Sequence, residues 1–187
     1  MKTRKIICLI LALTAICTLA GCAGQKAPET KLTGTADAVL TALLEDVNAK
    51  ISSPVMALPV PDITAENSLY GIGLTGDDFT NYVTSVSASK GALNTNAHEV
   101  IVLECKDAKA ASSAKAILVE PPVNEGDDGY NPKKWICVMP DEGFAVESGN
   151  YLLIVVSNKE FCEAAKTAFQ TEAGTIGDIN VFWEGAE

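Results

Sequence analysis

The chain has 187 residues, with 14 basic and 24 acidic side chains and a formal net charge of −10. This length suits one domain with enough interior for a hydrophobic core. Because phosphate backbones and anionic lipid headgroups repel a protein of this charge, binding to nucleic acid and direct docking on a membrane surface are disfavoured.

The first 21 residues have the layout of a secretory signal peptide. Lys2, Arg4 and Lys5 precede an apolar run over residues 6–19, and small residues follow. The run is about 14 residues long, whereas a helix that spans a bilayer needs roughly 20. We therefore predict a cleaved signal rather than a resident transmembrane helix. Its removal leaves 11 basic and 24 acidic residues, a formal charge of −13.

The signal ends in Leu19-Ala20-Gly21-Cys22, which resembles the lipobox of bacterial lipoproteins. The resemblance implies cleavage before Cys22, a diacylglyceryl thioether on its sulfur, and fatty acyl chains such as palmitate that hold the protein on the extracytoplasmic face of the cell membrane. Two acyl chains suit stable anchoring, because a single chain binds a membrane only marginally. The alternative is an ordinary cleaved signal with an accidental cysteine.

Residues 22–34 are small and polar, and they predict a flexible tether ahead of one globular domain over residues 35–187. The domain begins with a predicted helix over residues 36–51, which Thr35 can cap and whose apolar residues recur at helical spacing. The next stretch, residues 54–68, contains three prolines and predicts an irregular segment. Asp77 can begin a short helical turn, and alternation predicts a half-buried strand through Tyr82, Thr84 and Val86.

The second half of the domain predicts strands and helices in alternation. Residues 99–105 are apolar on both faces and predict a central strand. Asp107 caps a helix that extends to about Val119. Residues 144–146 and 151–157 predict a hairpin. A Ser157–Glu160 capping box predicts the start of a final helix, which ends at Gly174. Residues 179–183 are expected to form an edge strand or to lie along the core. This order predicts an α+β fold, with a mainly antiparallel sheet of about four strands and helices packed on one face.

Several of these features together resemble a family of small Gram-positive lipoproteins known as domain of unknown function 4358. They are the lipobox, the first amphipathic helix, the Glu99-Val100-Ile101-Val102-Leu103 strand before an Asp-capped helix, the Pro140-Asp141-Glu142 turn, the Gly149-Asn150-Tyr151 strand start and the closing helix. The likeness covers roughly residues 36–172. It implies a secreted, membrane-tethered domain and brings no known activity or catalytic residue.

The cysteines do not form a disulfide framework. Cys8 and Cys17 leave with the signal and Cys22 carries the lipid, so the three that remain are Cys105, Cys137 and Cys162. At most one disulfide can form among three thiols, and we favour three small buried hydrophobic side chains.

Two motifs associated with catalysis or phosphate binding are present without their usual context. Residues 71–76 fit G-x-G-x-x-G, but the residues before them do not form a buried strand, so a turn is favoured. Residues 87–90 and 112–115 fit S-x-x-K, the nucleophile signature of penicillin-binding enzymes. The S-D-N and K-T-G elements of that chemistry are missing, so both are interpreted as chance matches.

The sequence offers no cofactor motif and no metal-ligand spacing. His98 is the single histidine, and next to a predicted strand it is better interpreted as a hydrogen-bonded imidazole than as a catalytic base. Residues 124–129 hint at a calcium loop. Glycine occupies the second ligand position there and Trp135 stands where the bidentate glutamate belongs, so a solvated acidic turn is favoured.

The aromatic residues are interpreted as core rather than as a sugar-stacking platform. They are Tyr130, Trp135, Tyr151, Phe161 and Phe169. For Trp183 both interpretations remain, because an exposed indole beside Phe182 would form an apolar patch that suits a partner.

The sequence therefore predicts a lipid-anchored extracytoplasmic module that binds an envelope protein as an adaptor. The alternative is an enzyme that acts on envelope material through unrecognised carboxylates. A transporter's solute-binding component is disfavoured, since the chain is short for two lobes.

Overall fold

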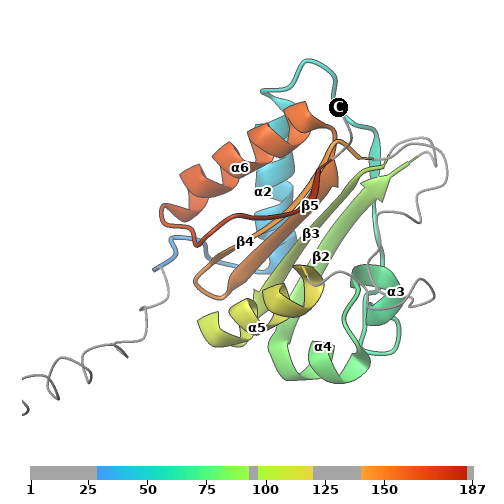
Figure 1. Ribbon diagram of the computed structural model, residues 1–187, viewed down its shortest axis with the longest axis vertical. Helices are drawn as coiled ribbons and strands as arrows, with labels where there is room; N and C mark the ends of the chain where they lie inside the picture. The colour runs from blue at the N-terminus through green and yellow to red at the C-terminus, as the bar shows by residue number, and fades with distance from the viewer. Residues whose placement is uncertain (1–28, 93–96, 120–139, 185–187) are drawn as a thin grey trace, which may run out of the picture.

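The computed structural model describes residues 29–92, 97–119 and 140–184 (Figure 1). Six strands of the described chain form one antiparallel sheet in the order β1-β2-β3-β5-β4-β6. The elements in chain order are α2 (Ala36–Asn48), β1 (Ala57–Pro59), α3 (Ser68–Ile72), α4 (Gly76–Tyr82), β2 (Val83–Gly91), β3 (Glu99–Cys105), α5 (Ala108–Val119), β4 (Glu142–Ser148), β5 (Tyr151–Ser157), α6 (Lys159–Ala173) and β6 (Asn180–Glu184).

The α+β class and the antiparallel sheet are confirmed, but the predicted number of strands is too low. The sheet has six strands rather than about four, because β1 adds to one edge and β6 to the other. β1 is three residues long and lies in the proline-containing stretch where the sequence predicts irregular chain. A strand this short shows no alternation that a sequence pattern can detect. β6 settles the choice for residues 179–183 in favour of an edge strand.

The prediction that helices cover one face of the sheet is wrong, because both faces are covered. In β3, Val100 and Val102 belong to the apolar cluster that includes α2 and α6, whereas Ile101 and Leu103 belong to the cluster that includes α5. Figure 1 shows α2 and α6 on one side of the sheet and α5 on the other. Successive residues of a strand point to opposite faces, so a strand that is apolar throughout needs cover on both sides.

The helix that begins the domain starts as predicted and ends earlier. The hydroxyl of Thr35 accepts a hydrogen bond from the Ala38 N–H and caps α2. The helix ends at Asn48 rather than at residue 51, although Ile51 remains buried. The predicted cap of α5 is also confirmed, since the Asp107 carboxylate accepts from the Ala110 N–H at 2.7 Å.

The hairpin of β4 and β5 is confirmed, and it leads into α6. The two strands join through Gly149, whose φ of +57° lies in the region that glycine adopts without strain, and Asn150. The capping box is wrong by one residue. Asn158 caps α6 by accepting from the Phe161 N–H, and the Glu160 carboxylate accepts instead from the N–H and hydroxyl of Ser52.

The predicted boundary between tether and domain at residue 34 is too late in the chain. The Lys31 N–H donates to the Ala173 carbonyl at 2.9 Å, and the Leu32 side chain is buried. The Tyr151 hydroxyl donates to the Gly34 carbonyl at 2.6 Å. Residues 30–34 therefore pack against the end of α6 and the β4–β5 hairpin, and they belong to the folded domain.

Candidate functional site

The candidate site lies where β6 completes the sheet beside α6. Phe144 of β4 pairs with Val181 of β6, so their side chains share the face of the sheet that α6 covers. Glu142 pairs with Glu184 farther along the same two strands. This arrangement places an apolar pair and an acidic pair next to each other, and the β6 member of each pair, Val181 and Glu184, is exposed.

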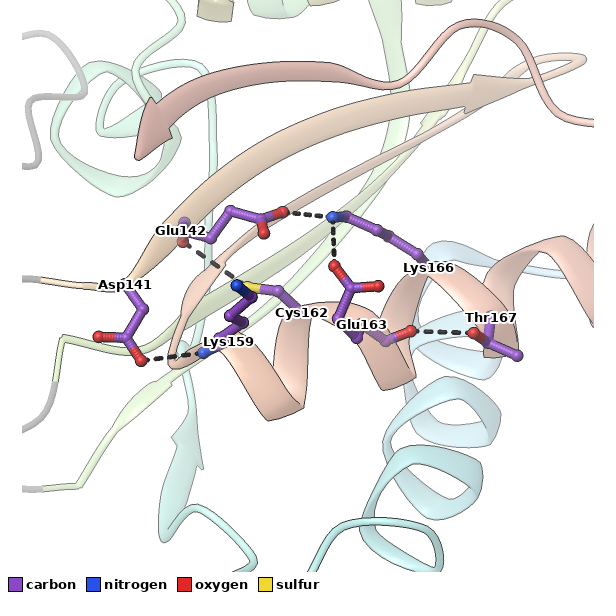
Figure 2. Close-up of polar contacts among 7 residues, drawn as sticks. All are labelled: Asp141, Glu142, Lys159, Cys162, Glu163, Lys166 and Thr167. Atoms are coloured by element: carbon purple, nitrogen blue, oxygen red, sulfur yellow. Dashed lines mark hydrogen bonds and ion pairs between the residues drawn. The ribbon is translucent and has the colours of Figure 1, made fainter. Parts of the chain in front are cut away.

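A lysine of α6, Lys166, forms ion pairs with two glutamates at this edge (Figure 2). The Lys166 ammonium lies 2.5 Å from a carboxylate oxygen of Glu142 and 2.9 Å from one of Glu163, and 5.2 Å from the centroid of the Phe144 ring. Burial acts to lower the pKa of Lys166, but its hydrogen bonds and ion pairs with both glutamates outweigh burial and raise it overall. Lys166 is therefore held as a cation, which suits binding and does not suit a nucleophile or a base.

Cys162 lies next to this lysine in α6, and it is an inert thiol. Its side chain is fully buried, and its sulfur lies 3.6 Å from the Glu142 carbonyl oxygen, to which it donates. Burial, and then the charge of Glu142, raise the pKa of the Cys162 thiol to about 12. Because the thiolate is the nucleophile, a thiol with this pKa is unreactive at neutral pH.

Two aromatic side chains attach β6 to the domain. A Cβ placed on Gly143 would lie 2.7 Å from the ring of Phe182, so glycine is what allows that ring to lie over β4. The Trp183 indole N–H donates to the Pro140 carbonyl at 3.0 Å. The pairing register shifts between Val181 and Trp183, which turns Phe182 toward the apolar cluster of the α5 face.

The exposed apolar surface at this edge comes from aliphatic residues and not from the indole. Trp183 is half-buried, whereas Val181 is 44% exposed and Ile179, just before the strand, is 40% exposed. Two exposed acids, Asp178 and Glu184, flank these residues. Sequence reasoning drew attention to Trp183 and missed the aliphatic pair, although their spacing of two along an edge strand was a usable signal.

His98 is buried and is held by the sheet. Its Nδ1 lies 2.9 Å from the Ser157 hydroxyl oxygen, and its ring packs edge-on against Phe161. Burial lowers the pKa of His98 to about 4, so the imidazole is neutral at pH 7. The prediction of a hydrogen-bonded histidine is confirmed, and a catalytic base at this position would have no access to a substrate.

The two S-x-x-K matches do not bring a serine to a lysine. In β2 the Ser87 hydroxyl donates to Asp37, and Lys90 pairs with Glu99 at 3.1 Å. In α5, Lys115 forms an ion pair with Glu147 and donates to the Asp178 carbonyl. Both lysines are thus engaged by carboxylates rather than by a serine hydroxyl, whereas the nucleophile of this motif needs a base beside it.

The G-x-G-x-x-G match forms a turn between two short helices. It begins at the end of α3 and reaches α4, which Thr75 caps by accepting from the Asp78 N–H. Gly73 has a φ of +84°, and the Ile72 and Leu74 side chains on either side of it are buried. No strand runs into the motif, so the prediction of a turn is confirmed.

The remaining predicted residues divide between the core and the undescribed chain. Tyr151, Phe161 and Phe169 are core residues, as predicted. Cys105 is also a buried free thiol, and its pKa is raised to about 12 by burial. Cys105 and Cys162 belong to apolar clusters on opposite faces of the sheet and are not bonded to each other. The predictions for Cys22, Cys137, Tyr130, Trp135 and residues 124–129 lie outside the described residues.

Comparison of this chain with protein-family models, with curated proteins and with solved structures gave no match. Within residues 29–92, 97–119 and 140–184, no group of three or more His, Cys, Asp or Glu side chains is placed to hold a metal ion. The site consists of paired charges beside an exposed apolar edge. Such an arrangement can bind a complementary surface, and its lysine is held as a cation by two glutamates.

Proposed function

We propose that this protein is a lipoprotein whose domain acts as a binding module on the extracytoplasmic face of the cell membrane. The observation that carries the anchor is Leu19-Ala20-Gly21-Cys22 at the end of a basic and then apolar segment. The packed chain begins about eight residues after Cys22, so a lipid on that cysteine would not disturb the core. In the part of the chain that the structure describes, no helix has the length and apolar character to cross a bilayer.

The binding role is supported by how the reactive side chains are engaged. Burial holds His98 neutral, while Cys105 and Cys162 are protonated thiols. An enzyme acting on envelope material through two carboxylates gains no support from Glu142 and Glu163, because Lys166 pairs with both of them. The resemblance to the lipoproteins of domain of unknown function 4358 stays a prediction.

The anchor is tested by replacing Cys22 in the full chain. We expect Cys22→Ala to lose labelling by a palmitate analogue and to move from the membrane fraction to the soluble fraction with its fold intact. Cys17→Ala is the matched control, because this cysteine lies in the predicted signal, and it should remain labelled and membrane-bound. Retention and labelling of Cys22→Ala would show that Cys22 is not the anchor.

A further inference from the structure

The two edges of the sheet differ in whether they can accept another strand. At the β1 edge, the Val60 N–H donates to the Ala88 carbonyl, and the Met56 carbonyl accepts from the Ala92 N–H. Alternate residues of an antiparallel strand face the same neighbour, so the backbone groups of Pro59 point away from the sheet. Proline has no N–H to donate, and this edge is therefore closed to a continuous ladder.

Among the residues that the structure describes, the β6 edge has no such outward proline. No proline or lysine occurs between Gly177 and Glu184, the residues that form and precede this strand. An edge strand presents a row of outward N–H and C=O groups that can pair with a further strand. Ile179 and Val181 expose apolar side chains beside those groups, so a strand added here would bury apolar surface as well as form hydrogen bonds.

The charges at this edge decide between a second copy of the chain and a different partner. In an antiparallel pair of two β6 strands centred on Val181, the end of one copy that carries Asp178 would lie beside the end of the other that carries Glu184. Acidic groups brought together at both ends of the pair would repel each other. Asp178 and Glu184 are both exposed, and the chain as a whole carries a charge of −10. The edge therefore disfavours its own copy and favours a basic strand.

We infer that β6 binds an extended basic segment of another protein by strand addition. The segment places apolar side chains against Ile179 and Val181, and lysine or arginine side chains against Asp178 and Glu184. This inference rests on the proposed binding role and names its surface and its type of partner. It does not depend on the lipid, because the β6 surface belongs to the folded domain.

The test uses the full chain in detergent micelles and a displayed library of short random peptides. We expect the enriched peptides to alternate apolar residues and to carry lysine or arginine at their ends. The most enriched peptide, once synthesised, should slow amide hydrogen exchange in Asn180–Glu184. No enrichment, an acidic or uncharged consensus, or protection of a different surface would each overturn the inference.

Variants at both edges locate the binding surface. We expect Val181→Lys to weaken binding of the selected peptide by about tenfold or more, whereas Leu58→Lys at the β1 edge should leave it unchanged. Both positions are exposed, so the fold should be retained. Asp178→Lys combined with Glu184→Lys should turn the selected consensus from basic to acidic. Equal effects at the two edges, an unchanged consensus, or a dimer that Val181→Lys dissociates would contradict strand addition by a basic partner. Because these measurements do not require the lipid, they can fail while the membrane test succeeds, and the reverse also holds.

Discussion

The two edges of the sheet expose similar side chains, but their backbones differ. At the β1 edge Met56 is 67% and Leu58 is 59% exposed, which is more than the 44% of Val181 at the β6 edge. The β1 edge nevertheless has the proline that faces outward. Exposed apolar area alone therefore does not identify a docking edge in a sheet, because the available N–H and C=O groups decide whether a strand can be added.

The strands next to the two edges, β2 and β4, also differ in the kind of contact that they make with the rest of the domain. β2, beside β1, uses serine hydroxyls to contact its neighbours: Ser85 accepts from the Ala36 N–H, and Ser89 lies within hydrogen-bond distance of the Leu58 carbonyl. β4, beside β6, instead carries Glu142, which Lys166 neutralises. The β1 side thus adds serine hydroxyls to the Lys90–Glu99 ion pair, whereas the β6 side lies against a lysine shared by two glutamates.

Lowering the pH should have the largest effect on the free energy of unfolding. The same experiment tests whether the two edges of the sheet unfold as one cooperative unit. The His98 carbonyl accepts a hydrogen bond from the Gly91 N–H of β2, on the β1 side of the sheet. Its ring is hydrogen-bonded to the Ser157 hydroxyl of β5, on the β6 side. Its folded pKa of about 4 lies below the ordinary value of 6.5, so its stabilising contribution is complete above pH 6.5 and is lost as pH falls through 4. We expect a loss of up to about 3 kcal/mol in the free energy of unfolding over this range, measured by urea titration at several pH values.

A variant without the imidazole separates this effect from the other groups that titrate there. Burial raises the pKa of Glu99, which acts in the opposite direction by stabilising the folded state as pH falls. His98→Gln should therefore show a smaller loss of stability in acid than the wild type, or a gain. The same acid dependence in both proteins would show that His98 is not the responsible group. Separate transitions for the amides of β1 and β6 would show that the edges unfold independently.

Removing the cation at the β6 edge should have the next largest effect. The Lys166 and Glu142 side chains are 17% and 13% exposed, so Lys166→Met leaves a mostly buried carboxylate without its partner. We expect a loss of about 2 kcal/mol, less than for a fully buried pair, by chemical denaturation. Lys50→Met is the matched control, because the Lys50–Asp46 pair is exposed and should contribute less than about 0.5 kcal/mol. Equal losses in the two variants would argue against a special role for Lys166.

The smallest effect should come from a methyl group placed under β6. Gly143→Ala puts a Cβ 2.7 Å from the Phe182 ring, so the ring has to move away from β4. We expect a loss of about 1 kcal/mol and faster amide exchange in β6, with β1 unchanged. Gly71→Ala is the control, since its Cβ would lie at an ordinary 3.6 Å from Ile63. Faster exchange at both edges would mean that Phe182 does not hold β6 specifically.

The elements that the sequence predicts well are those whose signals are local. Asp107 and Thr35 cap helices through side chains close in the sequence, and the apolar run in β3 requires a central strand wherever it is placed. The prediction of a capping box was wrong because Ser157 is hydrogen-bonded to His98, and Glu160 accepts hydrogen bonds from Ser52. Neither contact can be inferred from sequence spacing. The second layer of helix was missed for a related reason, because alternation shows that both faces of β3 are apolar without showing what covers them.

The candidate site was harder to predict than the fold. Lys166 and Glu163 are three residues apart in one helix, so their proximity follows from helical geometry. Glu142 joins them only because β4 lies against α6, which depends on the order of strands in the sheet. The exposure of Val181 depends equally on β6 being the last strand. Sequence alone can list such residues, but it cannot say which of them lie at an edge.

The contact of Lys31 with the end of α6 would limit the distance between the domain and a bilayer if the proposed anchor is present. If Cys22 carries lipid, the roughly eight residues between it and the packed segment reach at most about 29 Å when fully extended. The chain enters the domain beside Gly149 and Ala173, so this end of the sheet has to lie near the headgroups. β6 runs antiparallel to β4 and therefore begins at this end, and the exposed pair Ile179 and Val181 lies in its first half. Binding at that edge would take place within a narrow layer above the membrane, where segments of other membrane-bound proteins are concentrated.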